Sequence, residues 1–519
     1  MKKILNKQLA KKIIFFSLLL VFFLFISKAY YQRFAAFGCF DECFNYTAGY
    51  FMLKGRVLYE SIYFNHQPLM AYLSYFIQLI SRPASVYHLV LYHKMFVLIF
   101  AILMDIVLII RFRFIGAGFV LFYEATKFYL MGNLFIPESL IVYPLAYMMG
   151  VILFKFSARK TFPIDIIMSG IFAWFVVFMR EPYIILAIIM YGLILFNRKM
   201  SYPKLISFIL FLLLTLLVLG SLNLKEYIFQ VVENNFHGVF RSEVENNQIL
   251  GMGIYKVFLY PFLIFIEGQW TFLRTILFGL DIIFLGSILI LFIKTKKILI
   301  PIIIFLILGF SNLRATVPGK MFYESFHMLS WYGLFLISTL FLSYELYYWE
   351  KTKKIGSVLI FFVCMLFSYS IFSPNSFLKE NFNSEKEYLR NFAQYYVFGE
   401  AVRLLSKPGD TIFINRENDL IYWQTKLDSA YKYAIFYGNG IKKFEVARNE
   451  MFQNNPPDFY YYYLCSGKKS GSPQIPDFKK EEYVALNYID KSCLYVKKSK
   501  ISSVSQDTWD KLKVLRFYL

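Results

Sequence analysis

Long apolar segments separated by short polar loops dominate the first 373 residues of the chain. The first apolar segment, residues 13–30, follows a lysine-rich start and is long for the core of a signal peptide. We interpret it as an uncleaved first membrane crossing. Ten further apolar segments follow, at residues 86–110, 115–131, 138–155, 164–180, 182–197, 205–224, 275–293, 298–310, 321–343 and 356–373. Several are shorter than the roughly 20 residues that a perpendicular transmembrane helix needs. The pattern predicts a polytopic α-helical membrane protein with about eleven transmembrane helices.

The pattern changes after residue 373, where the chain becomes polar and is punctuated by proline and glycine. Residues 385–405 have the spacing of an amphipathic helix. Strands are predicted at residues 411–415, 459–464, 483–489 and 493–498. We therefore expect a transmembrane domain over residues 1–373, which includes a first outer loop at 31–85, and a soluble α/β domain over residues 374–519.

The composition supports a membrane protein. Of the 519 residues, 58% are hydrophobic and 21% are aromatic, and the mean hydropathy is +0.51. These values lie outside the usual range of soluble proteins. Only 17% of the residues are charged, yet the net charge is +21. In a soluble protein this charge would indicate a nucleic-acid partner, but here the basic residues stand in short loops beside apolar segments. We expect membrane lipids as partners and no nucleic acid.

The loop charges also predict the orientation of the chain in the membrane. Every second loop is basic, and with the predicted spans these loops lie on the same side of the membrane as the basic N-terminus. Their basic residues are Arg111, Arg113, Arg159, Lys160, Arg198, Lys199, Lys204, Lys294, Lys296, Lys297, Lys351, Lys353 and Lys354. The positive-inside rule places these loops and the N-terminus in the cytoplasm. An odd number of spans then places the C-terminal domain outside. In the third outer loop, 225–274, the aromatic run Tyr255–Trp270 is expected to lie along the interface.

Several kinds of chemistry have no motif in this chain. There is no glycine-rich phosphate loop, and Gly438-Asn439-Gly440 is interpreted as a turn. The five histidines are scattered without zinc spacing, so we name no metal ligand and expect no cofactor, and the metal requirement of the reaction stays open. Two cysteine couples, Cys39 with Cys43 and Cys465 with Cys493, are open to oxidation if their regions are extracytoplasmic. Free thiols are the default expectation, because a sequence does not show which sulfurs lie close.

Two adjacent carboxylates, Asp41 and Glu42, follow the first crossing. An isolated pair of acids is usually a solvated turn, whereas beside a membrane it also suits a catalytic base facing a lipid-linked substrate. Arg56 and His66 lie later in the same loop.

Other polar residues are placed on the same outer face by the predicted topology. Glu138 follows a proline at the start of a crossing, where a helix cap and a functional carboxylate are equally good interpretations. Arg180, just before the helix-breaking Pro182, is a candidate for binding a phosphate. The fifth outer loop and the helix after it add Arg314, Lys320, Tyr323 and His327. Tyr323 and His327 share a helix face, although a single histidine there is more often a packing residue.

The first loop resembles that of the GT-C membrane glycosyltransferases. The resemblance is carried by Asp41-Glu42, the turn Gly55 to Tyr59, and Asn65 to Leu69. The bacterial members related to protein mannosyltransferases and to the lipid A aminoarabinose transferase (glycosyltransferase family 39-like) are the most similar. Their pattern is Asp-Glu, a Gly-x-x-x-Tyr turn and a Pro-Pro-Leu stretch. In this chain Gln67 stands in place of the first proline of that stretch. Asn133 to Glu138 resembles the acidic motif of the second loop in the family.

The resemblance implies transfer of a sugar from a polyprenyl-phosphate donor to a lipid, glycan or protein acceptor, with inversion at the anomeric carbon. A phosphate leaving group needs cations and hydrogen-bond donors rather than a general acid, and the acceptor hydroxyl needs one base. By position in the family motif, Asp41 would be the base, and Glu42 would orient the base or the acceptor. The cations available for the phosphate would be Arg56, Arg180, Arg314 and Lys320.

Two other functions stay open at this point. An oligosaccharide ligase or polymerase is expected to have a large arginine-rich outer loop, whereas here the acids come first. A multi-pass transporter of lipids or polysaccharides fits the span pattern equally well. A transporter is less favoured because no run of alternating charges within the predicted spans suggests a proton relay.

Overall fold

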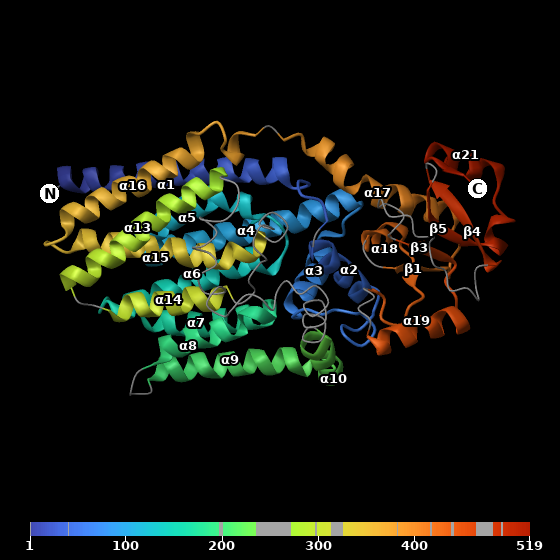
Figure 1. The fold of residues 1–519 in the computed structure, drawn as a ribbon, viewed down its shortest axis with the longest axis horizontal. Coiled ribbons are helices and arrows are strands. Elements are labelled where there is room, and N and C mark those ends of the chain that lie inside the picture. The colour runs from blue at the N-terminus through green and yellow to red at the C-terminus, as the bar shows by residue number, and fades with distance from the viewer. Residues whose placement is uncertain are drawn as a thin grey trace. The chain divides into compact units, whose positions relative to one another are not determined.

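The computed structural model describes residues 2–39, 41–196, 201–234, 271–295, 298–312, 325–380, 382–415, 418–436, 441–462, 481–488 and 491–518. These residues form two compact units (Figure 1). The helical unit comprises Met1–Phe34, Lys94–Val218 and Glu243–Ser384. The mixed unit comprises Ala35–His93, Leu219–Ser242 and Glu385–Leu519. The unit boundaries pass through three helices: α4 (Val86–Phe112), α9 (Tyr202–Gly220) and α17 (Ser384–Leu405).

Every apolar segment that the sequence predicts is helical over most of its length. The helices are α1 (Lys2–Arg33), α4 (Val86–Phe112), α5 (Phe114–Thr126), α6 (Pro137–Phe156), α7 (Pro163–Met179), α8 (Ile184–Leu195), α9 (Tyr202–Gly220), α13 (Phe272–Thr295), α14 (Leu299–Ser311), α15 (Leu329–Tyr348) and α16 (Lys353–Phe372). Within the described residues, seven helices are long and apolar enough to cross a membrane: α1, α4, α6, α9, α13, α15 and α16. The other four, α5, α7, α8 and α14, have 12 to 17 residues. The chain is therefore a helical membrane protein.

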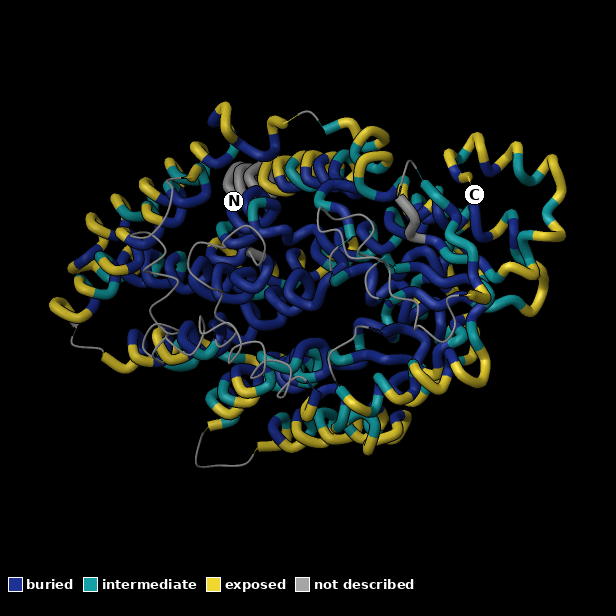
Figure 2. Tube along the Cα trace, turned by 45° about the vertical axis from the view of Figure 1, so that its right-hand side comes forward, coloured by how far each residue is buried: buried dark blue, intermediate teal, exposed yellow. Residues whose placement is uncertain are grey.

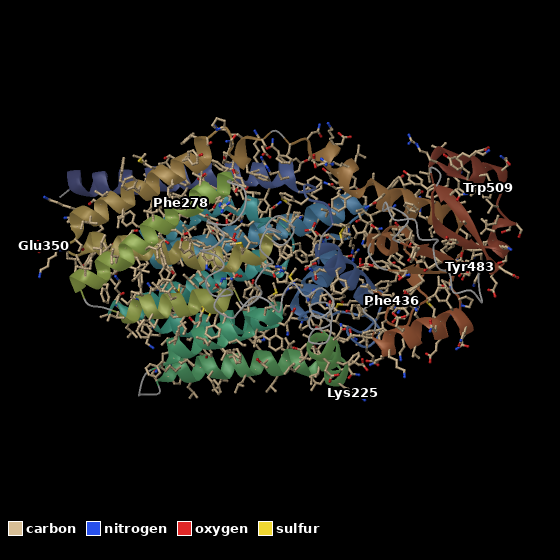
Figure 3. The ribbon with its side chains drawn as sticks, viewed as in Figure 1. Lys225, Phe278, Glu350, Phe436, Tyr483 and Trp509 are labelled. Carbon is tan, nitrogen blue, oxygen red and sulfur yellow. A yellow bond between two sulfur atoms is a disulfide. The ribbon has the colours of Figure 1, made fainter. Side chains whose placement is uncertain are left out.

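Helix α15 is the centre of the helical unit. It packs against α5, α6, α13, α14 and α16 (Figure 1). In its most apolar stretch 94% of the residues are buried, against 17% in α1, α9 and α16. Figure 2 shows the same contrast, with buried residues inside and exposed residues on the outer helices. Exposed apolar side chains such as Phe278 on α13 cover outer faces (Figure 3), as expected where lipid is the solvent.

Prolines set several helix boundaries in this unit. Pro137 and Pro163 stand at the first positions of α6 and α7, where a missing N–H is tolerated. Helix α7 ends at Met179 and Arg180 is extended, and Pro182 cannot continue the helix because it has no N–H and its ring would clash with the preceding turn. The short η2 helix (Glu181–Tyr183) then leads into α8. The predicted break at Pro182 is confirmed.

The mixed unit combines the first loop with a six-stranded sheet. Its helices are α2 (Asp41–Leu53), α3 (Leu69–Ser81), α10 (Leu224–Tyr227), the π-helix η3 (Ile228–Glu233), α17 (Ser384–Leu405), α18 (Leu420–Thr425), α19 (Lys442–Asn454), α20 (Lys498–Ile501) and α21 (Gln506–Val514). The strands are β1 (Thr411–Asn415), β2 (Asp428–Ser429), β3 (Phe459–Tyr462), β4 (Tyr483–Tyr488), β5 (Lys491–Lys497) and β6 (Phe517–Tyr518), in the order β2-β1-β3-β5-β4-β6.

The sheet confirms the strand predictions and adds to them. Strand β1 pairs in parallel with β2 and β3, while β5 pairs antiparallel with β3 and β4. The predicted helix and all four predicted strands are present, within one or two residues where the chain is described. The two-residue strands β2 and β6 and the helices α18, α19 and α21 were not predicted. They are too short or too polar for periodicity alone to indicate them.

The first loop shares its compact unit with the C-terminal segment, a division that differs from the one expected at residue 373. Helices α2 and α3 pack closely at Gly49, where an added Cβ would come within 2.7 Å of Ser74 Oγ. Gln78 of α3 donates to the Tyr46 carbonyl at 2.8 Å and accepts from Trp423 Nε1 of α18 at 3.1 Å. One buried amide therefore ties α2, α3 and α18 together.

Arg56 makes a second connection between the first loop and the C-terminal segment. Its Nε donates to Asp428 Oδ1 at 3.0 Å, and its Nη atoms donate to the carbonyls of Ser429 at 2.5 Å and Tyr431 at 3.1 Å. The Arg56 side chain is 16% exposed. The guanidinium is therefore engaged by protein acceptors on several sides, and we interpret Arg56 as a joining residue.

Replacing Arg56 with alanine is expected to loosen α2 and β2. We expect a loss of about 3 kcal/mol, because several charge-assisted hydrogen bonds disappear together. Hydrogen exchange followed by mass spectrometry on the full-length protein should show the amides of α2 and β2 exchanging on the order of a hundred-fold faster.

Arg403→Ala is the matched control. Arg403 of α17 pairs with Glu400 at 2.6 Å but is 61% exposed, and an exposed pair contributes less than about 1 kcal/mol. Equal exchange of α2 in the two variants would contradict the joining role of Arg56.

Candidate functional site

The acid pair of the first loop begins helix α2 in the mixed unit. Asp41 is the first residue of the helix and is half-buried, whereas Glu42 is fully buried. Carboxylates in a first turn are stabilised by the positive end of the helix dipole, which helps Glu42 to remain away from water. Burial and the nearby Glu42 charge raise the pKa of Tyr46, one turn further on. Glu42 is thus held inside the unit, and Asp41 is the more accessible carboxylate.

A disulfide joins Cys39 to Cys43 beside this pair. Their Cα atoms are 5.5 Å apart, well inside the range that a disulfide can bridge. The default expectation of free thiols is wrong for this couple, because the bend at Cys39 brings its side chain back over the first turn of α2. Cys465 lies outside the described residues, so the second couple stays a prediction. The disulfide links the segment before α2 to the helix that carries Asp41.

Three residues of the first-loop motif, Gly55, Tyr59 and Pro68, each lie where the backbone changes direction. Gly55 has a φ of 84° and Tyr59 has a φ of 66°, both in the left-handed region. The Tyr59 hydroxyl donates to the His66 carbonyl at 2.7 Å. Pro68 is the N-cap residue of α3. The half-buried His66 ring lies edge-on to Phe64, with 6.0 Å between ring centroids.

Gln67 occupies the position where the similar family has a proline. Its side chain is 2% exposed, and its Oε1 accepts from the Tyr227 hydroxyl of α10 at 2.9 Å. The amide therefore links the loop to α10, a contact that proline has no side-chain polar group to make. The departure from the family pattern thus comes with a specific local interaction.

A buried ion pair between α6 and α7 is the second candidate group, in the helical unit. Glu138 is in the first turn of α6, Arg180 follows the last turn of α7, and both are fully buried. Glu138 Oε1 lies 3.3 Å from Arg180 Nε. The position of Glu138 suits a helix cap and its contact suits a charge partner, so the carboxylate fills both roles at once.

His327 and Asn133 belong to the surroundings of this pair. His327 lies in the short helix η4 (Ser325–Met328), which packs against α6, and its carbonyl accepts from the Tyr183 hydroxyl at 3.2 Å. Tyr183 is in the η2 helix directly after Arg180. The side chain of Asn133, in the loop before α6, is buried and makes no hydrogen bond to any described residue. Sequence reasoning did not single out Tyr183, and it named Asn133 only as the start of the stretch Asn133 to Glu138.

Some predicted residues are not placed. Arg314, Lys320 and Tyr323 lie outside the described residues, as does the aromatic run Tyr255–Trp270. The structure brings Glu138, Arg180 and His327 to one region of the helical unit, while Asp41, Glu42, Arg56 and His66 belong to the mixed unit. In the part of the chain that the structure describes, no three His, Cys, Asp or Glu side chains gather closely enough to hold a metal ion.

Removing the Glu138 charge is expected to destabilise the helical unit. Glu138→Gln removes a counter-charge that lies 3.3 Å from the buried Arg180 guanidinium, which costs about 3–5 kcal/mol. The double variant Glu138→Gln/Arg180→Gln should recover part of this loss, because neither member of the pair is then charged. Thermal unfolding of the four members of this cycle in detergent measures the coupling.

Asp507→Asn is the control for the cycle. Asp507 pairs with Lys511 on α21 at 2.6 Å, but it is 74% exposed, so we expect a change below about 0.5 kcal/mol. If the double variant lost the sum of the two single losses, Glu138 and Arg180 would not be coupled.

No family model matches the chain, and no curated protein matches it either. What the protein does is therefore inferred from its own residues, their burial and their partners. Two groups carry that inference, the acid pair at the start of α2 and the buried ion pair between α6 and α7.

Proposed function

We propose that the protein is a GT-C type membrane glycosyltransferase that transfers a sugar from a polyprenyl-phosphate donor to a lipid, glycan or protein acceptor outside the cytoplasmic membrane. The observation that carries the proposal is the position of Asp41 and Glu42. One carboxylate is accessible and the other is buried on the same helical turn. This is the division of roles that a base and a positioning acid require. The motif landmarks that follow, Gly55, Tyr59 and Pro68, all occupy structural transitions.

In the proposed reaction, Asp41 removes the proton of the acceptor hydroxyl as the oxygen attacks the anomeric carbon. The bond from that carbon to the phosphate oxygen breaks, and the electron pair leaves on the lipid phosphate. That phosphate already carries its charge well, so no proton donor is needed. Glu42 holds the start of α2 and thereby Asp41. The resulting sugar has inverted configuration because attack and departure occur on opposite faces.

We also propose that Arg180, within the helical unit, binds a phosphate group. A guanidinium presents five N–H donors in a plane, more than one carboxylate satisfies, and it binds phosphate oxygens in pairs. Glu138, whose Oε1 lies 3.3 Å from Arg180 Nε, compensates the charge of Arg180. Binding of a phosphate beside a buried guanidinium is strong because little water screens the pair.

The proposed topology has eleven crossings, with the N-terminus inside and the C-terminal domain outside. We assign seven of these crossings to the long apolar helices and the other four to the shorter helices α5, α7, α8 and α14. The Cys39–Cys43 disulfide supports an oxidising compartment for the first loop, because disulfides persist outside the cytoplasm.

A transporter is the alternative function from a different class. The buried charges of the helical unit bear on it. Lys127 Nζ lies 2.5 Å from Glu124 Oε2 and donates to the Tyr143 hydroxyl at 2.7 Å. This pair is neutralised internally, as the three-residue spacing predicts, and its polar atoms are satisfied by protein groups. Such a pair fits a structural role better than a moving charge.

Asp41→Asn is expected to lower sugar transfer by roughly 100- to 10,000-fold, since the base is lost while the fold is kept. Transfer of radiolabelled sugar from a polyprenyl phosphate to an extract of envelope lipids and glycans, in proteoliposomes, measures the rate. Asp507→Asn, an exposed carboxylate on α21, is the control and should transfer at the wild-type rate. Wild-type transfer by Asp41→Asn would remove Asp41 as the base. Uptake of the intact lipid without transfer would favour the transporter.

Reporter fusions test the proposed topology. Alkaline phosphatase fused after Ser373 should be active, because that position is expected outside, and the same enzyme fused after Lys160 should be inactive. A fluorescent protein that folds only in the cytoplasm should give the opposite pattern. Phosphatase activity restricted to the Lys160 fusion would overturn the orientation, and activity at neither position would overturn the span count.

A further inference from the structure

A cavity at one end of the helical unit belongs to none of the groups described above. Its volume is about 860 Å³, and it lies where α4 ends, α5 begins and the loop between α6 and α7 passes. Four cations line it: Arg111, Arg113, Arg159 and Lys160. The sequence singled out these residues only as markers of the predicted cytoplasmic side. Together they make a basic cavity at the end of α4, one of the helices able to cross a membrane.

Two of the four cations are already neutralised. Asp165, fully buried, accepts from Arg111 Nε at 2.5 Å and Nη2 at 2.7 Å, and also from the Tyr147 hydroxyl at 2.9 Å. Arg159 Nη2 lies 2.5 Å from Glu345 Oε1 of α15. These contacts hold Arg111 and Arg159 in place in the lining of the cavity and leave no net charge on either pair.

The other two cations are in excess. Arg113 and Lys160 are exposed, and neither forms an ion pair with any described residue. Lys160 Nζ lies 5.0 Å from the centre of the Phe162 ring, and Arg113 has a left-handed backbone with a φ of 52° at the turn into α5. The cavity therefore carries a surplus of about two positive charges, which attracts an anionic phosphate group.

Three apolar residues of the lining are exposed. Ile110 is 74% exposed, Phe114 is 77% exposed and Ile164 is 54% exposed. Such side chains next to unpaired cations suit a ligand with a charged head and hydrocarbon chains, whereas inorganic phosphate or a nucleotide would leave them in water. Phosphate groups of a bilayer also lie at the ends of its spanning helices.

We propose that this cavity binds the phosphate group of an anionic glycerophospholipid, with Arg113 and Lys160 contacting the phosphate and Ile110, Phe114 and Ile164 contacting the acyl chains. Arg111 and Arg159 hold the walls through Asp165 and Glu345. The site is separate from the acid pair of α2 and from Glu138 and Arg180. It does not depend on the proposed transfer reaction, because lipid binding is measured without any sugar donor.

The experiment is native mass spectrometry of the full-length protein in a neutral detergent, titrated with phosphatidylglycerol. We expect Arg113→Gln/Lys160→Gln to bind this lipid roughly thirty-fold more weakly than the wild-type protein, since each cation near a lipid phosphate contributes about a factor of five. The charge-keeping variant Arg113→Lys/Lys160→Arg should bind within about two-fold of wild type. Lys353→Gln/Lys354→Gln removes the same charge from exposed lysines outside the cavity lining and should leave binding unchanged.

Three further binding measurements identify the chemical class of the ligand. Phosphatidylcholine, which has no net charge, should bind much more weakly than phosphatidylglycerol, and inorganic phosphate at millimolar concentration should not displace the lipid. Equal binding of the two lipids, or wild-type binding by Arg113→Gln/Lys160→Gln, would overturn the proposal. Displacement by inorganic phosphate, or binding of a polyprenyl phosphate in preference to phosphatidylglycerol, would also overturn it. If the double variant does not fold, the exposed single site Arg113→Gln is expected to lose about five-fold and decides the outcome.

Discussion

The helical unit depends on one constraint: a charge buried among the helices is costly unless a group of the protein compensates it. Hydrocarbon offers no hydrogen bonds, and an unpaired charge there costs several kcal/mol. The helical unit meets this constraint with short-range pairs, Glu124 with Lys127 and Asp165 with Arg111. Buried Arg33, at the end of α1, is met by backbone carbonyls, among them that of Glu380 at 2.9 Å, and by the faces of two phenylalanine rings. The Arg111–Asp165 pair joins the end of α4 to the first turn of α7.

The same constraint explains what could be predicted from the sequence. Helices that face lipid are continuous apolar runs, so their positions follow from composition, and α7 ends where proline stops it. The strands of the C-terminal segment follow from short β-branched and aromatic runs between turns. Both signals are local. The grouping of the first loop with the sheet is not local, because it depends on Arg56 and Gln78 reaching residues more than 340 positions away.

For the candidate site residues, too, the local sequence shows some properties while others depend on tertiary contacts. The acid pair Asp41-Glu42 was visible as two carboxylates after a crossing, but which of them is accessible depends on how α2 packs. For Glu138 the sequence left cap and function equally open, because the choice depends on Arg180 at the far end of another helix. The Cys39–Cys43 bond needed the bend before α2, and Gln67 needed Tyr227 of α10. In each case the missing information is a tertiary contact.

Arginine has two different uses in the helical unit, and the difference is one of burial. Arg180 is fully buried, so it requires Glu138 and any ligand it binds must compete with or join that carboxylate. Arg113 is exposed at a helix end, where water and lipid headgroups already satisfy a cation, and it needs no acid. A phosphate therefore gains more binding free energy from Arg180, but to reach the guanidinium it must compete with or join Glu138. Selective recognition is expected at the buried arginine, and looser, exchangeable binding at the exposed one.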